Sequence, residues 1–300
     1  MLKVVTNPLE ANCITHSGTM HADEVFATAF LELYLKEVKV YRTPSLLNNI
    51  PHEAIIYDIG RGEFDHHQID AKRRENNIPY SSIGLLWNHF GRKYLETCKI
   101  ENVEEVFLGV DKDLIEGIDA DDNGVFPKIE ANYKVKTISN IIKIFNPSYD
   151  SNEVESEQFQ KAVELAKRIL QEEIIYITGK VKADIIVQQE LSNIKENQKY
   201  LILEKYLPYE DTILNSEQAN SILFVAFPSN RGGYAIKTIP KSITDKTARL
   251  EFPKEWAGLT DEELEQASGI KGLRFCHTSR FIVTCDTIDT VYKVMEKLCQ

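Results

Sequence analysis

Two short apolar segments, each followed directly by a histidine or an aspartate, most strongly constrain how this chain can fold. Residues 12–15 lead into His16, and residues 54–57 lead into Asp58. Their length and composition predict two buried strands. From residue 22 to residue 38, apolar side chains recur at helical spacing, which predicts a helix soon after the first strand. This order of elements favours an α/β fold built on a parallel sheet.

Histidine and aspartate side chains gather where these predicted strands end. In α/β sheets, strand ends and the turns that follow them are the usual places for site residues. Imidazole and carboxylate groups together are typical of hydrolytic divalent-metal centres. One of the aspartates at 119, 121 and 122 is expected to be a ligand, and the sequence does not choose among them. The candidate ligands are His16, His21, Asp23, Asp58, Asp65, His66, His67, Asp119 and Asp122.

Mixed histidine and aspartate ligands suit Mn, Co, Fe or Zn better than Ca, which prefers oxygen ligands alone. Two such ions about 4 Å apart would lower the pKa of a bridging water and generate hydroxide. A nearby histidine would then act as a general acid or position a phosphate. We therefore predict two divalent cations, with Mn²⁺ favoured and Mg²⁺, Co²⁺ or Zn²⁺ as alternatives.

The second half of the chain has a different pattern. A long helical stretch covers residues 154–194, and short apolar segments separated by turns follow it. These segments predict a smaller α+β domain that ends in a helix over residues 288–298. We therefore divide the sequence into a metal-binding domain, residues 1–195, and a substrate-binding domain, residues 196–300.

Composition narrows the class of protein. The net charge of −11 argues against a globally basic nucleic-acid binder. The five cysteines are widely spaced and form no CxxC pair, which indicates reduced thiols and not a disulfide framework or a zinc finger. No apolar run approaches the length of a membrane span, and the N-terminus shows no signal pattern. We therefore expect a cytoplasmic protein without a membrane partner.

Several motifs occur in one order along almost the whole chain. They are THSGTMHADE, YDIG, DHHQ, IDADDNG, LPYE, WAGLTDEELEQASGIKG and FCHTS. In this order they resemble the DHH phosphoesterase superfamily, and more closely its MYG (melanocyte proliferating gene) branch, described as metal-dependent 3′–5′ exonucleases that act on RNA. The superfamily's first motif has an aspartate where this chain has His21, with one residue fewer in the spacing. The MYG branch shares this departure.

The resemblance also implies roles for individual residues of the first domain. It implies that Asp58 bridges the two metal ions and that His66 is a ligand. It further implies that Asp65 supports His66 and that His67 contacts the reacting phosphate. Asp119 or Asp122 would complete the second metal site.

The second domain resembles the family's substrate-binding domain. Because the guanidinium fork matches phosphate geometry, the candidates for phosphate contact are Arg231, Arg249, Arg274 and His277. The family tends to have the glycine-rich segment SGFIGG, whereas this chain has SRFIVT at residues 279–284. Glycines allow the backbone to approach a phosphate closely. Arg280 is the residue that could supply charge in their place.

The sequence thus predicts a metal-dependent phosphodiester hydrolase, a 3′–5′ exonuclease acting on single-stranded RNA or short oligonucleotides. One alternative is hydrolysis of a small nucleotide or cyclic dinucleotide, and another is a catalytically silent regulator that binds metal and RNA. A homodimer is a further expectation. A peptidase and a zinc deaminase are disfavoured, because neither HExxH nor PCxxC occurs.

Overall fold

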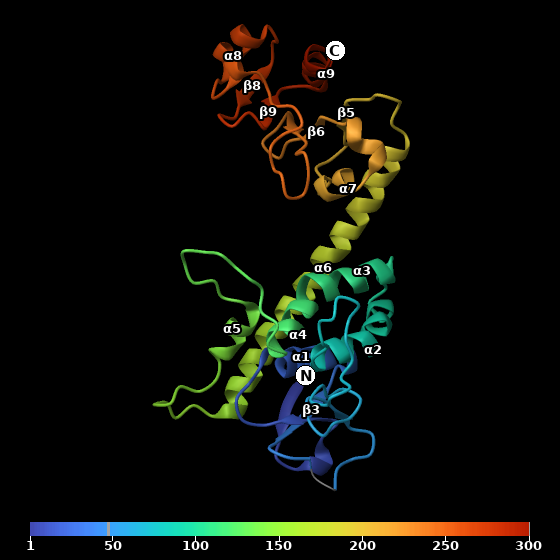
Figure 1. Cartoon of the computed structure of the whole chain (residues 1–300), viewed down its shortest axis with the longest axis vertical. Helices are drawn as coiled ribbons and strands as arrows, with labels where there is room; N and C mark the ends of the chain where they lie inside the picture. Colours follow the sequence, from blue (N-terminus) through green and yellow to red (C-terminus); the bar gives the residue numbers. More distant parts are fainter. Residues whose placement is uncertain (47–48, 300) are drawn as a thin grey trace. The chain divides into compact units, whose positions relative to one another are not determined.

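The chain is organised in two compact units. The computed structural model describes residues 1–46 and 49–299, and the units cover Met1–Gly179 and Lys180–Gln300 (Figure 1). The division falls inside helix α6, Glu155–Ser192, earlier than the predicted domain boundary at 195/196. The last turns of α6 belong to the second unit because Ala183, Val187 and Leu191 pack in its core.

A parallel sheet forms the base of the first unit. Its strands are β1 (Leu2–Val5), β2 (Cys13–His16), β3 (Val38–Thr43) and β4 (Ile55–Ile56), in the order β1-β3-β2-β4. Every pairing is parallel, and β2 lies between β3 and β4. This confirms the predicted α/β class and the two strands around residues 12–15 and 54–57.

Strand β3 was not anticipated, and the predicted helix from 22 to 38 is too long. Helix α1 (Ala22–Leu35) ends where Lys36 adopts a positive φ of 66°. Val38 then starts the strand, in which Val38 and Val40 are buried. The helical pattern of apolar residues ran on into the alternating pattern of a strand, and periodicity alone did not separate the two.

Helices cover this sheet and build the core of the unit. Helix α1 packs against β3 and against α2 (Ser82–Thr97). Phe30 of α1 meets Trp87 of α2 edge to face, with 5.2 Å between ring centroids. The remaining elements of the unit are the short 3-10 helix η1 (Pro8–Glu10), α3 (Val103–Val110), η2 (Asp111–Ile115), α4 (Glu116–Asp122) and α5 (Ile138–Lys143).

The chain is helical without a break from Val103 to Asp122, but its turns are not uniform. Between α3 and α4 the chain forms a π-helical turn, η2, over Asp111–Ile115. A π-turn adds a residue to the helical repeat and so rotates every side chain that follows it. It therefore affects the directions in which the aspartates of α4 point.

The second unit is a sheet with a core on each face. Its strands are β5 (Tyr200–Ile202), β6 (Phe224–Pro228), β7 (Tyr234–Thr238), β8 (Leu273–Cys276) and β9 (Ile282–Cys285), in the order β5-β6-β7-β9-β8. Only the β5–β6 pairing is parallel among these strands. The other elements are α7 (Glu210–Leu214), η3 (Glu217–Ser221), η4 (Lys254–Trp256), α8 (Asp261–Ser268) and α9 (Ile288–Leu298).

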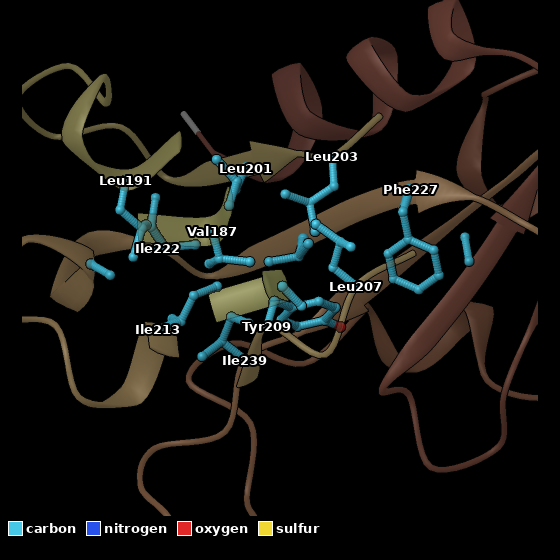
Figure 2. Close-up of a cluster of buried hydrophobic side chains, with 14 residues drawn as sticks. Val187, Leu191, Leu201, Leu203, Leu207, Tyr209, Ile213, Ile222, Phe227 and Ile239 are labelled. Carbon is cyan, nitrogen blue, oxygen red and sulfur yellow. The ribbon is translucent and has the colours of Figure 1, made fainter. Parts of the chain in front are cut away.

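The side chains of β6 point alternately to the two faces of the sheet, and this explains the two cores. Val225 and Phe227 face the cluster that includes the end of α6 (Figure 2), whereas Phe224 and Ala226 face the cluster that includes α8 and α9. Successive side chains of a strand point to opposite faces, so a strand covered on both sides is apolar throughout. The predicted α+β character of this region is confirmed. Among the described residues of both units, no helix is long and apolar enough to cross a membrane.

Two helical glycines predict opposite changes in stability. A Cβ at Gly84 in α2 would lie 1.9 Å from Asp119 Oδ2, whereas a Cβ at Gly179 in α6 meets nothing within 4 Å. We expect Gly84→Ala to lower the free energy of unfolding by about 1–3 kcal/mol through overpacking. Gly179→Ala should raise it by about 1 kcal/mol through helix propensity. Urea denaturation of the two variants checks both signs, and a neutral Gly84→Ala would contradict this packing.

Candidate metal centre

The site begins at the carboxyl edge of the parallel sheet. His16 is the last residue of β2, and Asp58 follows β4. The two strands are adjacent and parallel, with Cys13 paired to Ile55, so their ends meet at one edge. His16 Nε2 lies 3.1 Å from Asp58 Oδ2. Asp58 has a left-handed φ of 57°, a conformation that aspartate tolerates better than most residues.

The first turn of α1 contributes two buried carboxylates. The backbone N–H of His21 donates to both carboxylate oxygens of Glu24, at 3.1 and 2.9 Å, and so fixes the start of the helix. Asp23 and Glu24 are both completely buried. The positive end of the helix dipole favours negative charge at this place. Glu24 Oε1 also lies 3.6 Å from His16 Nε2, so this turn and the end of β2 face the same point.

His66 joins the sheet edge to the end of α4. Its Nε2 lies 3.1 Å from Asp58 Oδ1 and 3.2 Å from Asp122 Oδ2, while its Nδ1 faces Asn123 Oδ1 at 3.3 Å. The two oxygens of Asp58 therefore face different histidines, His16 on one side and His66 on the other. A carboxylate placed in this way is suited to bridge two cations.

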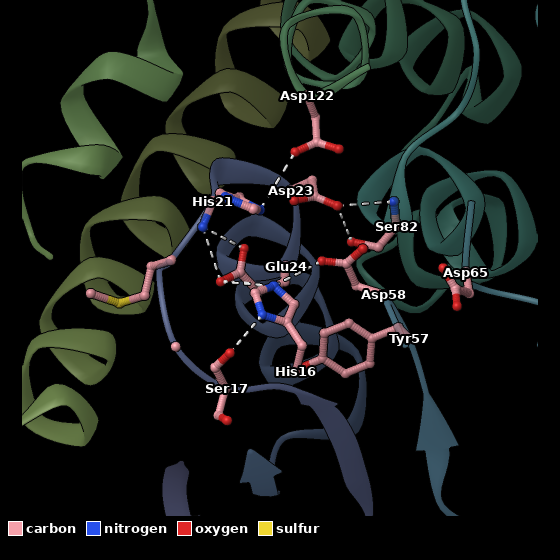
Figure 3. Close-up of polar contacts among 12 residues, drawn as sticks. His16, Ser17, His21, Asp23, Glu24, Tyr57, Asp58, Asp65, Ser82 and Asp122 are labelled. Atoms are coloured by element: carbon pink, nitrogen blue, oxygen red, sulfur yellow. Dashed lines mark hydrogen bonds and ion pairs between the residues drawn. The ribbon is translucent and has the colours of Figure 1, made fainter. Parts of the chain in front are cut away.

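Three groups of ligand atoms converge at this point, and in each group the atoms lie within 4.8 Å of one another. Figure 3 shows most of their members. Asp58 belongs to two groups, and so does His21, so the groups form one continuous cluster. The groups are His16, His21, Glu24 and Asp58; Asp58, His66 and His67; and His21, Asp23 and Asp122.

The residues present fit divalent cations. His16 Nε2 and Asp23 Oδ1 are buried and have no hydrogen-bond partner within residues 1–46 and 49–299. His16 Nε2 approaches Asp58 closely, but not at a hydrogen-bonding angle. Buried polar atoms without partners are costly, and a bound cation would satisfy them. The mixture of imidazole and carboxylate donors matches transition-metal ions better than Ca²⁺.

Burial and mutual repulsion raise the pKa of several carboxyl groups. Burial raises the pKa of Asp23, and the charge of Asp58 raises it further. Burial, with Asp23 and then Asp58 adding to it, raises the pKa of Glu24 well above its ordinary value. Burial also raises the pKa of Asp122 to about 8, again with Asp23 contributing. A divalent cation would reverse this repulsion and favour the ionised carboxylates.

The pKa values of Asp58 and His66 both shift so as to favour the charged form of the side chain. Burial raises the pKa of Asp58, but its contacts with His16 and His66 outweigh burial and lower the pKa to about 2. Burial lowers the pKa of His66, yet contact with Asp58, together with the charges of Asp23 and Asp122, raises it to about 9. Without a metal ion, protonated imidazole thus partly neutralises the carboxylates.

Asp65 supports a different histidine from the one that the resemblance implied. Its Oδ1 lies 2.7 Å from His67 Nδ1 and accepts the backbone N–H of His67, while its Oδ2 accepts the N–H of Arg61. The expectation that Asp65 supports His66 is therefore wrong. Asn123 contacts His66 instead. A side chain two residues before a histidine can close a local turn with it, and this local bond takes precedence here.

The structure separates Asp119 from Asp122. The carboxylate of Asp119 is completely buried and accepts hydrogen bonds from Arg74, Ser81 and the N–H of Gly84. It thereby caps the start of α2 and lies outside the three converging groups. Asp122, three residues later, faces His66 and His21. The geometry favours Asp122 for the ligand role that the sequence left open between the two.

The five candidates in the second unit lie at two ends of its sheet. Arg274 contacts Asp286 and donates to the carbonyl of Gly232 beside Arg231, at the β6–β7 turn. At the other end, Arg249 donates to backbone carbonyls of Ala219, Asn220 and Ile222, and Arg280 contacts Glu251 and the carbonyl of Phe252. His277 Nδ1 accepts the N–H of Ser279. The structure does not bring the five together.

Sequence reasoning missed three residues of the centre. Glu24 is one of the converging carboxylates. Ser82 donates from Oγ to Asp23 Oδ2 at 2.8 Å, and Asn123 contacts His66. Glu24 adjoins Asp23 in a motif already singled out, so a signal for it existed. Ser82 comes from a different helix, and no local pattern connects it with Asp23.

Comparison with known proteins identifies the family of this chain. A sequence profile of the MYG1 exonuclease family, described as uncharacterised protein family UPF0160, matches residues 12–298. The chain belongs to this family. A MYG1 protein of Dictyostelium discoideum is 30% identical over 89% of this chain and 90% of its own length. The human MYG1 exonuclease is 30% identical over 89% of this chain and 80% of its own length. The expected family and its hydrolase class are confirmed.

Two solved structures are distantly similar. A pGpG-specific phosphodiesterase, PggH, from Vibrio cholerae has a TM-score of 0.32 and 14% identity, covering 97% of both chains. RecJ from Thermus thermophilus, in complex with Mg²⁺, has a TM-score of 0.26 and 11% identity, covering 97% of this chain and 49% of RecJ. At these scores, neither structure bears on the details of this MYG1 family member.

Metal binding should stabilise the folded protein through Asp58. We expect Mn²⁺ to raise the melting temperature, because a ligand that binds only the folded state stabilises it. Asp58→Asn removes the shared carboxylate and should abolish most of this increase. Asp70→Ala, an exposed aspartate of the same loop, is the matched control. Differential scanning fluorimetry with and without Mn²⁺ measures the shifts, and an undiminished shift in Asp58→Asn would contradict the site.

The metal-free protein should lose stability as pH rises. A group whose folded pKa lies above its unfolded value contributes stability that is lost as pH rises through the folded pKa. Asp122, raised to about 8, and His66, raised to about 9, both act in this sense. We expect the melting temperature in EDTA to fall between about pH 4 and about pH 9. In Asp122→Asn the decline should be shallower, and equal slopes in the two proteins would refute this electrostatic account.

Proposed function

We propose that this protein is a metal-dependent phosphodiester hydrolase that removes nucleotides from the 3′ end of single-stranded RNA or short oligonucleotides. Two cations would be held by six residues, and Glu24 lies in the same group of ligand atoms as His16. The six are His16, His21, Asp23, Asp58, His66 and Asp122. Mn²⁺ is the favoured metal because imidazole and carboxylate donors are mixed. Membership of the MYG1 exonuclease family supports the same reaction class.

One observation carries the proposal. The two oxygens of Asp58 lie 3.1 Å from His16 Nε2 and 3.1 Å from His66 Nε2, so one carboxylate is shared by two ligand sets. When bound, two divalent ions would supply an activated water at neutral pH and offset charge on the transferring phosphoryl group. The protein's part is to hold the ligand atoms in place, and the paired strands β2 and β4 do this for His16 and Asp58.

His67 is the residue placed to act on the substrate. Its side chain is 60% exposed, although it lies only 3.8 Å from Asp58 Oδ1. Asp65 holds Nδ1 at 2.7 Å, which leaves Nε2 as the ring nitrogen available to a phosphate or a leaving group. A carboxylate on one imidazole nitrogen fixes both the tautomer and the orientation of the ring. His67 therefore serves as general acid or as a phosphate contact, and Asp65 positions it.

The charge of the chain favours short substrates. At a net charge of −11, the protein has no surplus of cationic side chains with which to neutralise a long phosphate backbone. A short single strand needs few phosphate contacts near the metal centre. An exonuclease, which engages a chain end, fits this balance better than an enzyme that grips a long duplex.

The substrate and polarity can be tested with end-labelled RNA. In Mn²⁺, a 5′-labelled single strand should give a ladder that shortens with time, whereas a 3′-labelled strand should release labelled mononucleotide at once. Both products should be absent in Asp58→Asn. Hydrolysis of nucleotides or cyclic dinucleotides without any RNA ladder would replace the RNA assignment with a small-molecule one. If the protein bound metal and RNA without hydrolysing the RNA, and Asp58→Asn lost this binding, the protein would be a catalytically silent regulator.

Substitution of the exposed histidine should separate chemistry from metal binding. We expect His67→Ala to lower kcat by about 10²–10⁴-fold while metal-induced stabilisation persists. Asp65→Ala should lower kcat by about 10–100-fold, because the ring loses its orienting partner. His89→Ala, an exposed histidine that pairs with Glu63, is the control. If His67→Ala turned over RNA like the wild type, another group would have to be the acid.

A further inference from the structure

A cavity in the first unit opens beside the proposed metal centre. It has a volume of about 360 Å³, and its lining includes His21 and Asp122 of the cluster together with Phe126, Ser139, Asn140 and Lys143. The size lies at the lower end of the range for small-molecule pockets, which suits a single nucleotide. Because His21 and Asp122 belong to both sites, a phosphate held at the centre would place its own nucleoside next to this cavity.

Helix α5 supplies Ser139, Asn140 and Lys143 to the lining of the cavity, and hydrogen bonds at both of its ends hold it in place. Asn146 accepts the N–H of Met20 at 2.7 Å and donates to the Met20 carbonyl at 3.0 Å. Thr137, at the start of α5, donates to Asp121 at 2.8 Å. These bonds tie α5 to the segment before α1 and to the end of α4. The α5 side of the cavity is thus held in place.

The chemistry of the lining suits a nucleotide. Phe126 is 67% exposed, which leaves a ring face for stacking. Ser139 Oγ is buried and lacks a hydrogen-bond partner in the part of the chain that the structure describes. It can bond to a base or a ribose hydroxyl. Lys143 is exposed, and no ion pair to it is found among the described residues, so it can face a phosphate.

The segment around the cavity differs in charge from the rest of the chain. Residues 124–143 contain one acidic residue, Glu130, within a protein of net charge −11. Phe126 and Tyr133 of this segment are both largely exposed. Exposed aromatics among cations are typical of single-strand binding surfaces. The lysines of the segment, all exposed, are Lys128, Lys134, Lys136 and Lys143.

We propose that this cavity binds the terminal nucleotide of the substrate. The base of that nucleotide stacks on Phe126, and Lys143 faces a phosphate. The inference rests on the proposed function and adds a substrate subsite in the first unit. Segment 124–143 is then the element that selects a nucleic-acid end. The sequence had assigned substrate binding to residues 196–300, with His67 as the phosphate contact in the first domain.

A matched pair of substrates tests the stacking. One is a short single-stranded RNA, and the other is the same RNA without the base of its 3′-terminal nucleotide. For intact RNA, Phe126→Ala should raise KM about ten-fold with little change in kcat, as expected for the loss of one stacked base. For the baseless RNA, wild type and Phe126→Ala should have equal KM. Tyr149→Ala, a fully exposed aromatic outside the cavity, is the control.

A substitution of Lys143 and a photocrosslink between RNA and protein complete the test. Lys143→Ala should raise KM for both substrates, whereas Lys161→Ala, an exposed lysine of α6, should not. RNA with 4-thiouridine at its 3′ end should crosslink, on irradiation, to the peptide that contains Phe126. A crosslink found only elsewhere, or an unchanged KM in Phe126→Ala, would overturn the subsite and leave the hydrolase intact. If wild type hydrolyses neither RNA in Mn²⁺, the proposed function itself fails, and the crosslink still decides the subsite.

Discussion

The repulsion among buried carboxylates is the constraint on which the first unit depends. Asp23, Glu24, Asp58 and Asp122 lie close together, and the first two are completely buried. Ionised groups in such a place are costly unless cations or hydrogen bonds compensate them. The neighbouring histidines, the hydroxyl of Ser82 and the start of α1 supply part of that compensation. A divalent cation bound at the cluster would supply the rest of that compensation.

The surrounding helices are arranged to keep this cluster in place. Asp119 is an aspartate like those of the cluster, but its role is structural, because it links Arg74 to Ser81 at the start of α2. Gly84 has no Cβ, and this leaves room for that carboxylate. The same helix start presents Ser82 to Asp23. One aspartate of α4 thus fixes α2, and another, Asp122, completes the cluster that α2 supports.

Local patterns revealed strands β2 and β4, the start of α1 and most of the cluster, because each depends on neighbours in sequence, whereas β3 was missed. The ends of β2 and β4 and the turn at His21 were predictable for this reason. The choice between Asp119 and Asp122 was not predictable, because it depends on tertiary contacts: Arg74 and Ser81 bind Asp119, whereas His66 faces Asp122. The partner of Asp65 and the role of Ser82 depend on tertiary contacts. The division of the chain at Gly179 lies within an unbroken helix, where composition gives no signal.

The SRFIVT segment shows how a motif can lose its glycines and keep its backbone. Arg280 adopts a left-handed φ of 55°, a conformation that favours the glycine found there in SGFIGG. Its guanidinium contacts Glu251 and the carbonyl of Phe252, which offsets the strain. Val283 is completely buried in the second-unit core, where glycine would leave a cavity. Arg280 and Val283 therefore stabilise this segment, and the guanidinium of Arg280 is engaged by contacts within the protein.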